Sequence, residues 1–273
     1  MQFIKSLFKL LFFICPAFAT AQSTFLTPGS KDVHFVDRME IKQQRNTDLN
    51  FSAVRPFNRK YIVEQVEFID SARLGYIDTA TQKDKYVEWN SQGLTDLDEY
   101  NLTSFLMNNS EWVTGPKKDF LSKRPFLKTF YKTKPNFLEV KTRNFFLAVN
   151  PVFQYVQGIE TGYSKPIYLN SKGVTLRGTI GKKIGFSTYL TDNQERGPQF
   201  FQQQVNYFRA VPGVGFYKPF KTSGYDYFDA RGYITVRAGN AIDVQFGYDK
   251  NFIGNGYRSL FLSDWGNSNL FLK

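Results

Sequence analysis

Residues 174–191, VTLRGTIGKKIGFSTYLT, decide the fold class, because apolar and polar side chains alternate along both halves of the stretch. In the first half, the two faces of an extended chain carry Val174, Leu176 and Ile180 against Thr175, Arg177 and Thr179. In the second half, Ile184, Phe186 and Leu190 share a face with Thr188. A period of two residues is typical of a β-strand with unlike faces. Gly181-Lys182 lies between the halves, so the stretch predicts a β-hairpin.

The same period returns nearer the C-terminus. The run from Tyr233 to Ala238 and the run from Ile242 to Tyr248 both alternate, and Gly239-Asn240 predicts a tight turn between them. A longer aromatic-rich run, residues 142–157, contains Pro151. That proline indicates a bend, an edge position or two separate strand pieces. Residues 141–273 are therefore expected to form mainly antiparallel β-structure of about five or six strands.

Two architectures explain the alternation. A soluble sandwich turns its apolar face to a core and its polar face to water. An outer-membrane β-barrel turns its apolar face to lipid and its polar face to a wet lumen. Phe, Tyr and Trp make up 18% of the chain, with 29 Phe and 16 Tyr, which suits the aromatic girdles of a barrel. We therefore favour an antiparallel outer-membrane β-barrel preceded by a small helical N-terminal region.

The N-terminus supports export. Lys5 and Lys9 precede an apolar run, LLFFICPAFA, and Ala19-Thr20-Ala21 has the small-x-small pattern of a cleavage site. Residues 1–21 therefore read as a secretory signal peptide, and the apolar run is too short to span a bilayer as a helix. The chain's one cysteine, Cys15, leaves with the signal. An exported chain without disulfides indicates the bacterial envelope and, with the barrel, the outer membrane.

Residues 22–140 are expected to carry about two helices. One runs from about residue 59 to residue 74 after an Asn58 cap, with Ile62, Val63, Val66 and Ile69 on its apolar side. The other runs from Thr95 or Asp96 to about Asn108, with Tyr100, Phe105 and Leu106 as its apolar side. Residues 22–58 are expected to be mostly irregular, with an extended patch at HFVDRMEIKQ, residues 34–43. A short helix is also expected at residues 199–209, between the strands.

The formal net charge of +11 favours acidic partners. Nucleic acid, anionic lipid and acidic polysaccharide all satisfy that charge, but export removes nucleic acid as a partner. Surface polysaccharide and outer-membrane lipid are therefore the expected partners, with envelope proteins as a further class.

Catalytic and cofactor motifs are weak. Gly254 and Gly256 begin a near match to a dinucleotide fingerprint, but the preceding strand alternates, Ser259 takes the third small position, and no acidic partner follows. A glycine-rich turn is the better interpretation. His34 is the only histidine, so neither a zinc site nor a catalytic triad is expected. We expect a non-enzymatic protein with no cofactor and no metal.

The polar strand faces and this turn suggest one binding surface inside the barrel. Arginine forks bind carboxylates and aromatic faces stack on sugar rings. The candidate glycan-binding or luminal residues are Arg177, Arg237, Asp243, Gln245, Asp249, Asn255, Tyr257 and Arg258. The alternative for each is a luminal salt-bridge network that only stabilises the barrel.

Seven segments in order resemble the Wzi-like capsule-assembly family of outer-membrane proteins, and most closely its Bacteroidetes branch, which includes the gliding-motility RemB-like group. The segments are VDRMEIK at 36–42, RPFNRKYI at 55–62, FLAVNPVFQY at 146–155, SKGVTLRGTIGKKIGFSTYLTDNQ at 171–194, AVPGVGFYKPFK at 210–221, DYFDARGYI at 226–234 and VQFGYDKNFIGNGYRSLFLSDW at 244–265. The ordered set, rather than any one motif, carries the resemblance.

The resemblance implies an outer-membrane β-barrel with a helical element near the N-terminus and lectin-like retention of capsule polysaccharide. The RemB-like branch implies instead a motility or adhesion role that acts through protein partners. A glycan-cleaving enzyme on a β scaffold is a third alternative, which no local pattern supports. Proteins of this family are longer than 273 residues. We therefore expect the sequence to be the N-terminal part of a larger barrel.

Overall fold

The computed structural model describes residues 23–43, 55–73, 94–115, 120–181, 183–238, 242–254 and 256–273. The predicted signal peptide, the predicted turn at residues 239 and 240, and Asn255 lie outside the described residues. Within the described parts, no helix has the length and apolar character that crossing a membrane requires.

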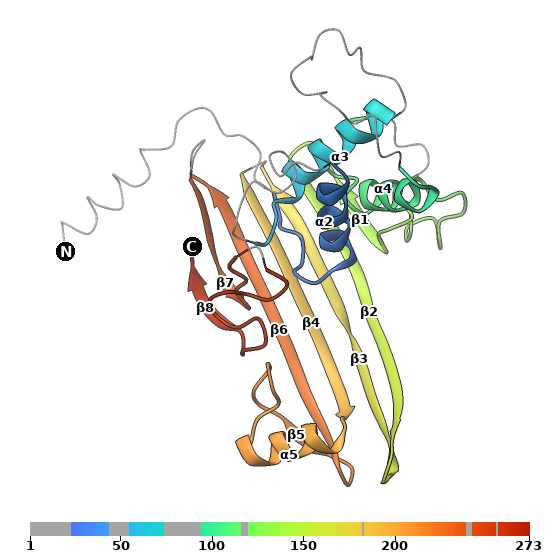
Figure 1. Cartoon of the computed structure of the whole chain (residues 1–273). Coiled ribbons are helices and arrows are strands. Elements are labelled where there is room, and N and C mark those ends of the chain that lie inside the picture. Colours follow the sequence, from blue (N-terminus) through green and yellow to red (C-terminus); the bar gives the residue numbers. More distant parts are fainter. Residues whose placement is uncertain are drawn as a thin grey trace, which may run out of the picture.

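The fold is dominated by one eight-stranded antiparallel sheet (Figure 1), which confirms the mainly β prediction and exceeds the expected strand count. Its strands are β1 (Leu138–Lys141), β2 (Phe145–Glu160), β3 (Tyr163–Ile180), β4 (Ile184–Arg196), β5 (Lys218–Phe220), β6 (Gly224–Arg237), β7 (Asp243–Asp249) and β8 (Asn269–Leu272). They follow the order β1-β2-β3-β4-β6-β7-β8, and β5 pairs with the start of β6. Among the described residues the sheet is open, with β1 and β8 at its edges.

The predicted hairpins are present in the expected register. Strand β3 pairs with β4 from Ile180 opposite Ile184, and β6 pairs with β7 from Arg237 opposite Asp243. Pro151 lies within a continuous β2, opposite Val174 of β3. Strand β1 covers only Phe146–Val149 of β2, so the proline stands where β2 has no second partner. Its edge position explains why a residue without an N–H is tolerated there.

The register gives the sheet two unlike faces, because residues opposite one another on paired strands project to the same side. The first, which we call the apolar face, carries Leu147, Val149, Leu176, Phe186, Leu190, Phe228, Ile234, Val236, Val244, Phe246, Tyr248, Leu270 and Leu272. The second, the polar face, carries Asn150, Thr175, Arg177, Ser187, Tyr189, Asp229, Arg231, Tyr233, Thr235, Gln245 and Asp249. The face assignments predicted from the sequence for β3, β4, β6 and β7 are thus confirmed.

The apolar face is the exposed one. Ile234 and Phe246, in the interior of their strands, are 50% and 52% exposed, and most of the larger apolar side chains around them are exposed as well. On β6 this face runs from Phe228 to Val236, nine residues, and beside Phe228 the exposed Asp192 of β4 and Lys172 of β3 mark the end of the apolar area. A tilted strand crosses a bilayer with roughly 9–11 residues. An exposed apolar area of this extent is atypical of a soluble monomer.

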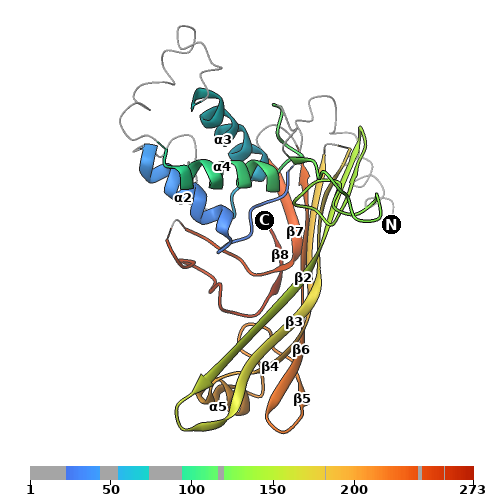
Figure 2. The same cartoon turned by 90° about the vertical axis from the view of Figure 1, so that its right-hand side faces the viewer.

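The helices all lie on the other side of the strands (Figure 2). Helices α2 (Lys31–Gln43), α3 (Arg59–Arg73) and α4 (Asp96–Asn108) form a small unit with its own apolar core. Asn58 caps α3 by accepting a hydrogen bond from the backbone N–H of Tyr61, as predicted. Helix α5 (Gln199–Phe208) lies at the opposite end of the sheet and packs on β6 through Val205.

Three predictions about the N-terminal region differ from the structure. Residues 34–43 are part of helix α2 rather than an extended patch, because Val33, Val36 and Met39 lie at helical spacing and are buried in the core shared with α3 and α4. The described part of this region therefore holds three helices instead of two. On α4, Tyr100 is exposed, and Leu102 takes the buried position beside Phe105 and Leu106.

Candidate binding cavity

Polar contacts fix the N-terminal unit on the polar face. The backbone N–H of Phe25 donates to the Tyr233 hydroxyl at 3.0 Å, and the Thr235 hydroxyl donates to the Ser23 carbonyl at 3.3 Å. The chain can approach this closely because β4 has Gly185 at the contact, where a Cβ would lie 2.9 Å from the Ser23 carbonyl oxygen. These contacts set the distance between the helices and the strands, and so they create the space between them.

Arg177 is the second anchor. Its guanidinium donates to the Asn108 carbonyl at 2.7 Å and forms an ion pair with Glu111 at 3.1 Å. Both side chains are largely buried. Removing one member of a buried pair leaves the other charged group without a partner, which is strongly destabilising.

We predict that Arg177→Ala loosens the N-terminal unit from the sheet. Limited proteolysis of the folded chain should cut residues 94–115 at least about tenfold faster than in the wild type, since cleavage follows the population of the opened state. Arg237→Ala is the matched control, because that arginine forms an ion pair with Asp243 of the neighbouring strand β7 and does not line the cavity. Equal cleavage rates for Arg177→Ala and the wild type would contradict the anchoring role.

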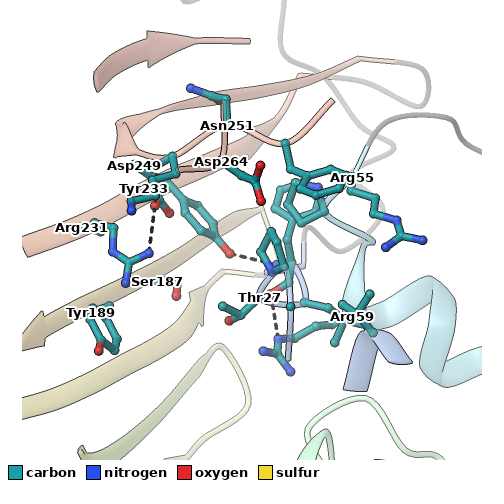
Figure 3. A pocket seen from close by; sticks show the side chains of 18 of the residues that line it. Thr27, Arg55, Arg59, Ser187, Tyr189, Arg231, Tyr233, Asp249, Asn251 and Asp264 are labelled. Atoms are coloured by element: carbon teal, nitrogen blue, oxygen red, sulfur yellow. Dashed lines mark hydrogen bonds and ion pairs between the residues drawn. The ribbon is translucent and has the colours of Figure 1, made fainter. Parts of the chain in front are cut away.

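A cavity of about 900 Å³ lies between the polar face, the start of α2 and the segment that connects β7 to β8 (Figure 3). The sheet contributes Tyr189, Arg231 and Tyr233 to its wall, and the N-terminal unit contributes Arg55 and Arg59. Its size suits a ligand of several rings or a short stretch of polymer. The wall mixes aromatic rings with cationic groups.

Arg231 is the cation that the sheet strand β6 contributes to the wall. Its guanidinium lies over the Tyr189 ring at 4.5 Å from the centroid and forms ion pairs with Asp229 at 3.1 Å and Asp249 at 4.0 Å. The Nε of Arg231 is buried and has no hydrogen-bond partner among the described residues. The Arg231 side chain as a whole is 24% exposed and lines the cavity, so a ligand can still contact it.

Lys250 follows β7 directly and adds a second cation. Burial, and then the like charge of Arg231, lower the pKa of the Lys250 ammonium. No ion pair of Lys250 is found within the described parts of the chain. Asp229, Asp249 and Asp264 act on Lys250 in the opposite direction. The preference for a negatively charged ligand comes from the whole lining, in which arginines and lysines outnumber aspartates and glutamates.

Arg55 and Arg59, the wall arginines of the N-terminal unit, also have structural contacts. Arg55 forms an ion pair with Asp37 at 2.8 Å and lies over the rings of Phe57 and Phe252. Arg59 donates from Nε to the Phe25 carbonyl at 3.1 Å and from Nη1 to the Asn109 side chain. Burial, and then the charge of Arg177, lower the pKa of Arg59. Figure 3 shows both arginines on the side of the cavity opposite Arg231.

The structure brings together five of the eight site residues predicted from the sequence. Lining the cavity are Arg177, Gln245, Asp249, Tyr257 and Arg258. Arg258 forms an ion pair with Asp264 at 3.0 Å and lies between the rings of Tyr257 and Trp265. Gly254 has φ of +106°, and the described residues after it form bends and turns, which agrees with a glycine-rich turn.

Arg237 and Asp243 do not join this group. They form an ion pair with each other at 2.8 Å, where β6 meets β7, and neither lines the cavity. Both side chains belong to the polar face, as the wall residues do, but they lie at the ends of β6 and β7, outside the cavity. The eighth residue, Asn255, lies outside the described residues.

Sequence reasoning missed Tyr189, Arg231, Arg55 and Arg59. The first two share the polar phase of β4 and β6, so alternation could have identified them once the strands were extended in both directions. Arg55 and Arg59 reach the cavity from a unit more than 100 residues away in sequence from the strands they face. No local pattern signals that approach.

The acidic residues of the cavity are mostly engaged with arginines: Asp37 with Arg55, Asp249 with Arg231, and Asp264 with Arg258. Within the described ranges, no group of three or more potential metal ligands comes together. The arrangement supports binding of an anionic, ring-containing ligand by arginine and aromatic side chains.

Comparison with models of known families, with curated proteins and with solved structures finds no significant match to this chain.

Proposed function

We propose that the chain forms part of a Wzi-like outer-membrane β-barrel that binds or organises an acidic surface polysaccharide without cleaving it. The observation that carries the proposal is the pairing of faces: the sheet exposes its apolar face and shelters its polar face beneath the helices. Lipid-facing and lumen-facing residues alternate in this way in membrane barrels. The residues of the cavity wall supply the binding chemistry.

The orientation follows from the connections. Bacterial barrels have short periplasmic turns and longer extracellular connections. At the end that carries α2, α3 and α4, the connections from β3 to β4 (residues 181–183) and from β6 to β7 (residues 238–242) are short. At the other end, the connections from β4 to β6 (residues 197–223) and from β7 to β8 (residues 250–268) are long, and the turn between β2 and β3 (residues 161–162) is the exception. The N-terminal unit therefore faces the periplasm, and α5 faces the cell exterior.

The glycan proposal predicts a role for Arg231. We expect the full chain in detergent to bind polygalacturonate with an affinity that falls as salt rises, because carboxylate–arginine pairs are screened. Arg231→Ala should weaken binding by roughly tenfold or more, the typical loss for a charge-assisted hydrogen bond.

Arg237→Ala is the matched control for this measurement, because Arg237 has the same charge on the same strand but lies outside the cavity. No binding to acidic polysaccharides, together with capture of defined envelope proteins, would favour the motility or adhesion role. Release of new reducing ends from the polymer would favour an enzyme.

A further inference from the structure

Helix α5 presents one complete face to solvent. Phe200, Tyr207 and Phe208 are 63%, 81% and 66% exposed, and the exposed Gln203 and Gln204 stand between them. These five residues have the spacing i, i+3, i+4, i+7 and i+8, which places them on one side of a helix. We call this set the α5 face.

The opposite side of α5 is firmly packed, so the α5 face is held in a fixed orientation. Val205 is fully buried, and the Phe201 ring meets the Tyr225 ring edge-on at 5.9 Å. Gln202 donates from Nε2 to the Gly197 carbonyl at 2.7 Å. Aromatic side chains that solvent surrounds on a rigid helix are typical of a recognition surface rather than of a core.

The segment that carries α5 has only positive charges, and the carboxylate shown in contact with the helix, Glu160, accepts a hydrogen bond from the Gln199 backbone N–H at 2.9 Å. Between Gly197 and Gly224 the sequence has Arg209, Lys218 and Lys221 but no aspartate or glutamate. All three cations are exposed. The surface therefore complements an acidic partner.

Two other occupants fit less well. A second copy of this chain would bring the same three cations against each other across a symmetric contact, which is unfavourable. Bilayer hydrocarbon would contact the apolar face of the sheet. Helix α5 packs against the other side of the sheet, so the lipid would not reach the α5 face (Figure 2).

We propose that the α5 face is an outward-facing binding platform for an acidic polysaccharide chain, separate from the cavity. Phe200 and Tyr207 are seven residues apart, which is about 10 Å along a helix, so their rings can stack on two separate sugars of one chain that are not direct neighbours. The aromatic rings stack on the sugar faces, Gln203 and Gln204 hydrogen-bond to hydroxyls, and Arg209 and Lys218 pair with carboxylates. This platform rests on the proposed function, because it names a site for the same class of ligand.

The test measures the affinity of the full chain in detergent for polygalacturonate, alginate and hyaluronate, with dextran as the neutral polymer. We expect binding to at least one acidic polymer and none to dextran. The triple change Phe200→Ala, Tyr207→Ala and Phe208→Ala should lower affinity at least about tenfold, since each aromatic contact contributes roughly two- to tenfold. Tyr207→Phe should retain most of the affinity, because it keeps the ring.

Ile159→Ala is the matched control, because Ile159 is a still more exposed apolar residue at the same end of the sheet and lies outside α5. Wild-type affinity in the triple variant would overturn the platform while leaving the proposed function intact. Failure of the wild type to bind any acidic polymer would overturn both. Loss of a wild-type dimer in the triple variant, measured by light scattering, would identify a second copy as the occupant and overturn the proposal.

Discussion

Ile234→Arg is expected to hinder stable insertion of the sheet into a bilayer, at a cost between about 1 kcal/mol, the value near an interface, and about 2–4 kcal/mol, the value at the midplane. Ile234 lies on the apolar face between Phe186 of β4 and Phe246 of β7. In water a half-exposed position of this kind would accept an arginine with little cost. In lipid the guanidinium would have no hydrogen-bond partner. The effect of the substitution therefore distinguishes a lipid-facing position from a water-facing one.

The measurement is the urea dependence of folding into lipid vesicles, followed by the shift in electrophoretic mobility between folded and unfolded chains. Thr175→Arg is the matched control, because Thr175 belongs to the polar face of the adjoining part of the sheet. That variant should insert nearly as well as the wild type. If Ile234→Arg instead inserts normally, or only improves solubility, the apolar face does not contact lipid.

Asp98→Ala is expected to destabilise the N-terminal unit by about 3 kcal/mol, because it removes the buried member of an ion-pair cluster. The Asp98 side chain is 0% exposed and accepts hydrogen bonds from Arg38 and Lys42, both at 2.5 Å. It also completes the capping box with Thr95 at the start of α4. Removing the carboxylate therefore leaves two cations together and one helix end uncapped.

Unfolding of this unit can be followed through Trp112, which packs against its core, in a background that replaces the other two tryptophans. Asp96→Ala is the matched control, because that exposed acid contributes only about 0.3–1 kcal/mol through the helix dipole. If Asp98→Ala lowers the free energy of unfolding no more than Asp96→Ala does, the ion-pair cluster around Asp98 does not have this stabilising role.

The same cluster predicts a pH dependence. Burial alone would raise the pKa of Asp98, but the hydrogen bonds from Arg38, Lys42 and Thr95 outweigh it and hold the pKa well below its usual range. The carboxylate therefore stabilises the folded state fully above the unfolded pKa of about 3.9. This contribution is lost as pH falls further towards the folded pKa. The stability gap between the wild type and Asp98→Asn should thus be constant near neutrality and narrow below about pH 4.

Alternation in the sequence identified most of the sheet, because side-chain phase alone decides which face a strand residue joins. It assigned Leu176 and Ile234 to the apolar face, and their sequence neighbours Arg177 and Tyr233 to the polar face, as the structure has them. It did not identify α2, whose Val33, Val36 and Met39 are sparse apolar positions that become a helix face only when α3 and α4 pack on them. Tertiary packing, rather than local propensity, decides that element.

The cavity was predictable only in part for a similar reason. Arg177, Gln245 and Asp249 follow from strand phase, and Tyr257 and Arg258 follow from the glycine-rich turn. Arg55 and Arg59 depend on how far the N-terminal unit reaches over the sheet, which contacts such as Phe25 to Tyr233 fix across about 200 residues. Phase also cannot tell that Arg237 stands beyond the end of the cavity, although it shares a face with Arg231.

The most direct test of the membrane proposal is a nitroxide scan of β3 from Val174 to Ile180 in bilayers, with Cys15 replaced so that each introduced cysteine is unique. Oxygen, which partitions into lipid, should reach labels at Val174, Leu176, Gly178 and Ile180 more readily than their neighbours. A water-soluble nickel chelate should not reach those four. Equal access of both reagents to these positions, or no period of two, would contradict a lipid-facing sheet.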